Sequence, residues 1–150
     1  MATDDPESCG DDAALRALIT RHEGRRAFAY HDSRGILTIG VGRNLRDRDL
    51  GEDEIDLLLT NDIALARDDC RRLFDSMFTA ASWPRQAALV SMAFNLGAPR
   101  LAGFQRMRDA ISCGDCQLAA SVALDSRWAV QTGRRAHHIA GMLRGGETSG

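Results

Sequence analysis

Residues 22–44 read HEGRRAFAYHDSRGILTIGVGRN, and this stretch decides how the rest of the chain is interpreted. It carries two carboxylates, Glu23 and Asp32. Glu23 stands where a helical pattern stops, because glycine follows it and glycine is the common residue just past a helix end. The residues around Asp32 are typical of a hairpin, with short β-branched and aromatic runs on either side of an Asp/Ser/Gly loop. One acid is therefore expected at a helix terminus and the other on a β-loop.

Residues 40–42, Gly-Val-Gly, follow the second of these runs and indicate a third, bent strand, since glycine permits sharp turning or the close approach of a ligand. We expect a shallow cleft between the two acids. Two carboxylates across a cleft suit the hydrolysis of a glycosidic bond: one protonates the leaving oxygen, and the other directs water or stabilises the cation-like sugar. Glu23 is therefore the candidate general acid and Asp32 the candidate second carboxylate.

The spacing of Glu23, Asp32 and Thr38, with the glycines at 24, 35, 40 and 42, resembles the T-even phage-type lysozymes of glycoside hydrolase family 24. The resemblance continues downstream and covers nearly the whole chain beyond the first dozen residues; it includes MAFNLG at 92–97, AGF at 102–104, SRW at 126–128 and QTGRRA at 131–136. It implies an α+β, mostly helical, lysozyme-like fold. A small N-terminal lobe with a β-hairpin or three-stranded sheet would be joined by a long helix to a helical C-terminal lobe.

The resemblance also implies roles for individual residues. Thr38 would place the attacking water with its hydroxyl, which favours inversion at the anomeric carbon. Arg135 would face the catalytic glutamate from a late helix. Phe94 and Asn95 would border the sugar cleft, and Asn44 is a further candidate for the cleft wall.

Each of these residues also has an ordinary structural interpretation. A glutamate at a helix end is commonly a surface residue, and an aspartate in a turn commonly accepts hydrogen bonds from the amides of its own loop. Thr38 fits an ordinary β-branched strand position. Phe94 fits a core position, and Arg135 fits a solvated helix face.

The chain has 150 residues, a size common for single domains, and its 44% hydrophobic content argues against disorder. We expect a flexible leader over 1–10, one lysozyme-like domain over 11–144 and a flexible tail over 145–150. Within the domain, the small lobe covers about 23–51, and the helical lobe covers about 52–144 plus the first helix, capped by Asp11 or Asp12. The pattern predicts a long helix ending near Phe74, a buried helix from Ser82, and helices at 100–111, 115–124 and 134–143.

The formal net charge of −2 provides no global basic field, which argues against nucleic acid as a partner. All 19 basic residues other than histidine are arginine, which is interpreted either as coding bias or as a means of binding an acidic polymer.

The acidic N-terminus is unlike a secretory signal, and no apolar run approaches the roughly 20 residues of a membrane span. The four cysteines are expected to be free thiols, and no metal or organic cofactor is expected.

The resemblance, together with the pair of carboxylates, implies a muramidase that hydrolyses the β-1,4 bond between N-acetylmuramic acid and N-acetylglucosamine in bacterial peptidoglycan. The predicted role is that of a bacteriolytic, antimicrobial endolysin. It would be a monomer in the host cytoplasm, would not insert stably into the membrane, and would reach the periplasmic wall through a separate holin-like protein. Two alternatives are a lytic transglycosylase acting on the same bond and a non-catalytic peptidoglycan-binding module.

Overall fold

The structure is a computed structural model that describes residues 6–145. The chain divides into two compact units, Met1–Glu52 (unit 1) and Asp53–Gly150 (unit 2). Helices dominate, and one small antiparallel sheet lies in unit 1, so the predicted α+β, mostly helical class is confirmed. The flexible leader over 1–10 and tail over 145–150 remain predictions: residues 1–5 and 146–150 lie outside the described range, and residues 6–10 belong to the first helix.

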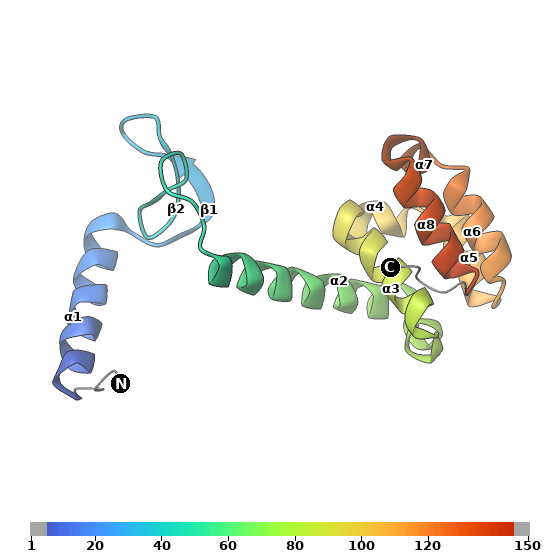
Figure 1. The fold of residues 1–150 in the computed structure, drawn as a ribbon, viewed down its shortest axis with the longest axis horizontal. Helices are drawn as coiled ribbons and strands as arrows, with labels where there is room; N and C mark the ends of the chain where they lie inside the picture. The colour runs from blue at the N-terminus through green and yellow to red at the C-terminus, as the bar shows by residue number, and fades with distance from the viewer. Residues whose placement is uncertain (1–5, 146–150) are drawn as a thin grey trace. The chain divides into compact units, whose positions relative to one another are not determined.

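Unit 1 consists of a helix followed by a three-stranded sheet in the order β1-β2-β3 (Figure 1). Its elements are α1 (Pro6–Glu23), β1 (Arg26–His31), β2 (Leu37–Gly40) and β3 (Arg43–Asn44). Helix α1 begins upstream of the aspartate pair at which the sequence placed its start, and it ends at Glu23 as predicted. Strands β1 and β2 form the predicted hairpin around the loop that contains Asp32.

The third strand lies further along the chain than the sequence suggested. Residues 41 and 42 form a turn, and β3 is the two-residue strand Arg43–Asn44 that pairs with β2. Gly40 and Gly42 have φ angles of 67° and 66°, in the left-handed region that favours glycine. The glycines therefore turn the chain between two strands, and the placement of a strand over 40–42 was wrong.

Unit 2 is built from helices that pack around one apolar core. After α2 (Glu52–Ala80) come α3 (Trp83–Leu96), α4 (Ala98–Ala102), α5 (Gln105–Ser112), α6 (Cys116–Leu124), α7 (Arg127–Thr132) and α8 (Arg134–Leu143). The backbone of α2 leaves the helical region at Asp75, where φ is 47° and ψ is −132°. This break falls one residue after Phe74, the predicted end of the long helix.

Two features of unit 2 differ from the pattern read in the sequence. The helix predicted at 100–111 is two helices, because the chain turns at Gly103 and Phe104 between α4 and α5. Helix α7 was not predicted, since six residues are too few to show a period. It is capped by Ser126, whose hydroxyl accepts a hydrogen bond from the N–H of Ala129.

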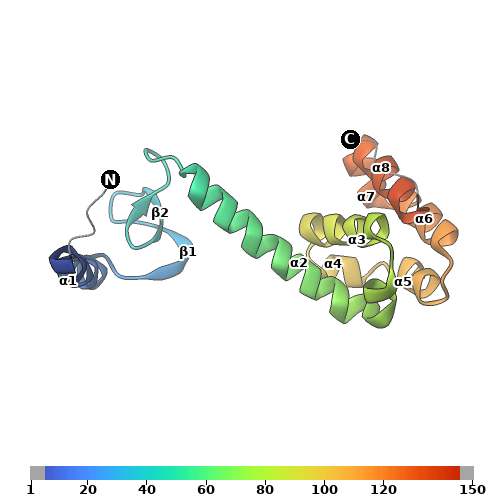
Figure 2. The same ribbon diagram turned by 60° about the horizontal axis from the view of Figure 1, so that its bottom comes forward.

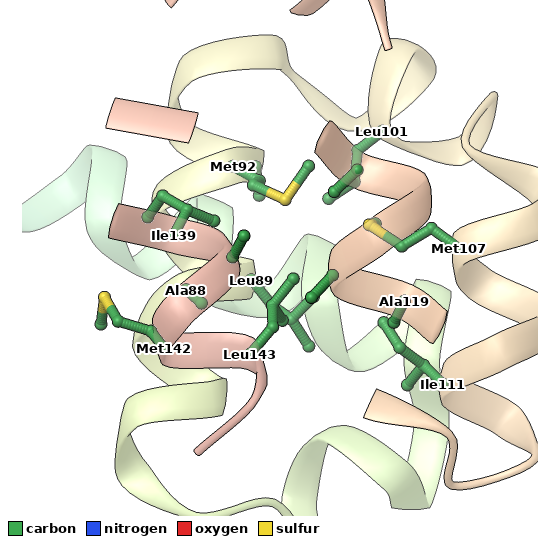
Figure 3. Packing of buried hydrophobic residues seen from close by; sticks show 14 of the residues in the cluster. Ala88, Leu89, Met92, Leu101, Met107, Ile111, Ala119, Ile139, Met142 and Leu143 are labelled. Atoms are coloured by element: carbon green, nitrogen blue, oxygen red, sulfur yellow. The ribbon is translucent and has the colours of Figure 1, made fainter. Parts of the chain in front are cut away.

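The core of unit 2 lies where α8 packs against α3, α6 and α7 (Figures 1 and 2). Its largest fully buried side chains are Met92, Leu101, Met107, Leu143 and Cys70, and Figure 3 shows how the first four interdigitate with their neighbours. Burial raises the pKa of the Cys70 thiol to about 12, so this cysteine is an inert core residue. No helix within residues 6–145 has the length and apolarity needed to cross a membrane.

Candidate active site

Glu23 is the last residue of α1, and its side chain lies against the backbone of Gly42. Gly24, with φ of 75°, ends the helix, and its N–H donates to the carbonyl of Thr20 at 2.8 Å. The position that a Cβ on Gly42 would occupy is only 2.8 Å from Oε2 of Glu23. The carboxyl group of Glu23 is thus placed beside the turn that joins β2 to β3.

Asp32 occupies the turn between β1 and β2, where backbone amides surround its carboxylate. Its Oδ1 accepts hydrogen bonds from the N–H of Arg34 at 2.8 Å and from the N–H of Ile36 at 2.9 Å. The Ile36 hydrogen bond is the main cause that lowers the pKa of Asp32; partial burial opposes it, and the N–H and guanidinium of Arg34 reinforce it. This carboxyl is therefore ionised at neutral pH, which suits a second carboxylate.

Thr38 is the one buried polar side chain among the residues whose burial the structure describes, with 4% of its surface exposed. Its Oγ1 donates to the carbonyl of Ile36 at 2.9 Å, and the same carbonyl accepts the N–H of Asp32 at 2.9 Å. The hydroxyl proton is thus engaged, and the oxygen keeps lone pairs that can accept a hydrogen bond. The placing of water by Thr38 stays a prediction.

The three predicted catalytic residues all belong to unit 1, and the sheet connects them. Thr38 pairs with Asn44 across β2 and β3, and Asn44 follows Gly42 of the turn by two residues. On its other side, Thr38 is tied through the Ile36 carbonyl to the turn of Asp32. Glu23 and Asp32 therefore approach the β2 strand at its two ends, with Thr38 between those ends.

The side chain of Asn44, predicted to form part of the cleft wall, is engaged in its own loop. Its Oδ1 accepts from the N–H groups of Arg46 and Asp47, at 2.8 and 3.1 Å, and its Nδ2 donates to Oδ2 of Asp47 at 2.9 Å. The side-chain hydrogen bond from Arg46 is the main cause that lowers the pKa of Asp47, and the bond from Nδ2 of Asn44 adds to it. Asn44 thus stabilises the loop after β3, and its contact with substrate stays a prediction.

Phe94 and Arg135 line the same hollow of unit 2, which we call the Trp83 groove. This hollow of about 350 Å³ is lined by Leu59, Ile63, Arg67, Trp83, Gln86, Ala87, Val90, Ser91, Phe94 and Arg135. Phe94 is 46% exposed, so it is a surface aromatic rather than the core residue of the alternative interpretation. Nη2 of Arg135 donates a hydrogen bond to Oγ of Ser91 at 3.5 Å. The predicted pairing of Arg135 with Glu23 stays a prediction.

Asn95 does not line the Trp83 groove with its neighbour Phe94; its side chain is bound to a residue of another hollow. Its Oδ1 accepts a hydrogen bond from Nε1 of Trp128 at 2.9 Å. Trp128 packs edge to face with Phe104, and both line a second hollow of about 770 Å³, which we call the Trp128 hollow. The lining also includes Arg100, Arg106, Arg127 and Gln131, none of which the sequence analysis assigned a role. Of these, Arg127 and Gln131 belong to the SRW and QTG motifs, which carried the resemblance to the family.

Sequence reasoning gave Gly42 a part in turning the chain or in the close approach of a ligand, and the structure places it against Glu23. The guanidinium of Arg26 lies 4.3 Å from the centre of the Tyr30 ring, which braces the outer strand of the sheet. Within the described part of the chain, no group of three or more His, Cys, Asp or Glu side chains is arranged to hold a metal ion.

The model of the phage lysozyme family matches residues 20–144, which include Glu23, Asp32, Thr38 and the helices of unit 2. The chain belongs to the phage lysozyme family. This is a family of glycoside hydrolases, the muramidases, as the resemblance of the sequence implied. The chain is also similar to the pre-baseplate central spike protein Gp5 of Enterobacteria phage T4, at 26% identity over 161 residues. That match covers 89% of this phage lysozyme chain but spans only 28% of the length of the spike protein.

Proposed function

We propose that this chain hydrolyses the β-1,4 bond between N-acetylmuramic acid and N-acetylglucosamine in peptidoglycan, with Glu23 as the general acid. The observation that carries this proposal is the position of the Glu23 carboxyl against Gly42, at the end of the strand that holds Thr38. Asp32, at the opposite end of that strand, supplies the second carboxylate. Membership of the phage lysozyme family supports a peptidoglycan-hydrolysing function.

The hydrogen bonds of unit 1 suggest how water is handled. Thr38 already donates its proton to the Ile36 carbonyl, so a water molecule would donate to Oγ1 of Thr38 and keep a lone pair for attack. A second hydrogen bond from that water to the ionised carboxylate of Asp32 would increase the nucleophilicity of the water, and Asp32 would take up its proton as the bond to the sugar forms. Glu23 would meanwhile protonate the leaving oxygen. Attack by water on the face opposite the leaving group gives inversion.

Replacement of the proposed acid is the direct test. We expect Glu23→Gln to lower the rate at which permeabilised Gram-negative cells are cleared by about 10²–10⁴-fold, the usual contribution of a positioned acid or base. Glu52→Gln is a matched control, because it makes the same change at an exposed residue at the start of α2. Equal clearing by the wild type and Glu23→Gln would contradict the assignment.

The products separate hydrolysis from its alternatives. NMR of the fresh product should show the inverted anomer, and mass spectrometry should show reducing muropeptides. An anhydro product, which lacks one water, would identify a lytic transglycosylase. Pelleting with peptidoglycan without any bond cleavage would identify a binding module.

The biological setting has two candidates. The first is host lysis by a monomeric, bacteriolytic endolysin that waits in the cytoplasm and reaches the wall through a holin-like protein. The second is a wall-degrading segment of a phage tail, which is favoured by the likeness to 28% of a central spike protein. Mass spectrometry of purified particles distinguishes them, since a tail component is present in stoichiometric amounts and a lysis enzyme is absent.

A further inference from the structure

We propose that Gly42 is a positioning residue for the acid Glu23. The absence of a side chain on Gly42 leaves the space that the Glu23 carboxyl occupies. The inference rests on the proposed function, because it assigns to Gly42 a part in holding the group that protonates the leaving oxygen. A Cβ built on Gly42 would lie 2.8 Å from Oε2, 3.1 Å from Cδ and 3.2 Å from Cγ of Glu23. All three distances are shorter than ordinary contacts, so no side chain fits at residue 42 while Glu23 stays in place.

Both partners in this contact are fixed by backbone structure. Glu23 is held at the end of α1, where the N–H of Gly24 donates to the Thr20 carbonyl. Gly42 is held in the turn between β2 and β3 with φ of 66°. The carboxyl therefore rests on a surface formed by peptide backbone, which has fewer conformations than a surface formed by side chains.

A side chain added at residue 42 is expected to change stability little and catalysis strongly. The atoms that a new Cβ would meet belong to the free end of a flexible side chain, so Glu23 can rotate away at little cost in folding free energy. The same rotation moves the acid away from the bond it must protonate. Misplacement of a catalytic group by about 1 Å can lower the rate on the order of 100-fold.

Gly40, the last residue of β2, provides a matched control two residues before Gly42. Its φ of 67° is nearly the same as that of Gly42, so alanine carries the same backbone strain at either position. A Cβ on Gly40 would meet no atom within 4 Å. Any difference between the two alanine variants therefore reports the contact with Glu23 and not the left-handed backbone.

The experiment compares Gly42→Ala with Gly40→Ala by kcat, KM and thermal unfolding, using purified peptidoglycan fragments. We expect similar decreases in Tm of a few degrees for both variants, a decrease in kcat of about 100-fold for Gly42→Ala alone, and KM changed by less than about threefold. Equal losses of kcat in the two variants would overturn the proposal, because strain would then explain the effect. Retention of kcat by Gly42→Ala would overturn it as well.

A second measurement does not depend on activity, and it separates failure of this inference from failure of the proposed function. The ¹³C resonance of the Glu23 carboxyl should shift in Gly42→Ala and stay in place in Gly40→Ala. If the Glu23 resonance is unmoved in both variants, the inferred contact between Gly42 and Glu23 is wrong, whether or not the chain is a muramidase. If Gly42→Ala does not fold, the double variant with Glu23→Ala removes all three close atoms. Recovery of folding then supports the contact, and continued failure overturns it.

Discussion

Each of the two units of the chain is stabilised internally by a different kind of interaction. In unit 1, Ile36 and Thr38 are the only buried side chains among the residues whose burial is described, and the turns are fixed by hydrogen bonds and by glycines with positive φ. In unit 2, a continuous apolar cluster from Ala66 to Leu143 carries the packing. The proposed chemistry lies in unit 1. The comparison teaches that the acids are positioned by backbone geometry, while most of the stability comes from burial elsewhere.

The largest effect that tests this contrast is expected from Asp32. In Asp32→Asn the amide oxygen can still accept from the N–H groups of Arg34 and Ile36, so the turn is kept while the charge is lost. We expect kcat to decrease by about 10²–10⁴-fold with little change in Tm. Asp32→Ala should lose the turn as well and unfold at a lower temperature. An Asp32→Asn protein within threefold of wild-type activity would break the assignment.

The next effect concerns the core of unit 2. Leu101→Ala removes a fully buried side chain and should lower the free energy of unfolding by about 2–5 kcal/mol, measured by urea denaturation. Leu118→Ala is the control, because that side chain is 46% exposed and should cost about 0.5 kcal/mol or less. The kcat of folded Leu101→Ala should match that of the wild type. Equal losses of stability at the two leucines would show that the cluster does not carry the packing we infer.

A smaller effect is expected at Thr38, which contributes to the stability of unit 1 and to the proposed chemistry. Thr38→Val removes the hydrogen bond to the Ile36 carbonyl and should cost about 0.5–1.5 kcal/mol, since that carbonyl keeps its bond from Asp32. It should also remove the acceptor for water and lower kcat. Thr38→Ser should keep both the hydrogen bond and the activity. Full activity in Thr38→Val would show that the hydroxyl does not place the water.

The smallest effect is the pH dependence that arises from Asp32. Its pKa is lower in the folded chain than the ordinary value of 3.8, so its ionised form favours folding above that value. The contribution is lost as the pH falls below 3.8 and through the folded pKa. The difference in Tm between the wild type and Asp32→Asn should therefore shrink below about pH 4. A difference in Tm that stays constant down to about pH 2 would show that the hydrogen bonds from the backbone N–H groups do not favour the carboxylate over the protonated acid.

Local sequence was sufficient wherever the chain interacts with its near neighbours. The loop of Asp32 was predicted correctly because its hydrogen bonds reach only two and four residues ahead. The end of α1 at Glu23 followed from Gly24, and the break at Asp75 fell beside the predicted helix end at Phe74. These features depend on backbone preferences that act over a few residues, and such preferences are visible in a sequence.

Other assignments failed or stayed incomplete for reasons of geometry. The sequence placed a strand over 40–42 because glycine is compatible with both a bent strand and a turn, and pairing with β2 decides between them. Phe94 and Asn95 were treated as one segment, but successive side chains on a helix point about 100° apart. Phe94 accordingly lines the Trp83 groove, whereas Asn95 accepts a hydrogen bond from Trp128, which lines the Trp128 hollow.

The sequence by itself determined the family, the α+β class and the candidate acids Glu23 and Asp32, because these follow from residue types at fixed spacing. Only the tertiary structure decided which group each acid rests against. The contact between Glu23 and Gly42 joins a helix end to a turn 19 positions later, across two strands. No local preference encodes such a distance; it is set when the hairpin folds back, and a residue without a side chain is what leaves the space for the carboxyl.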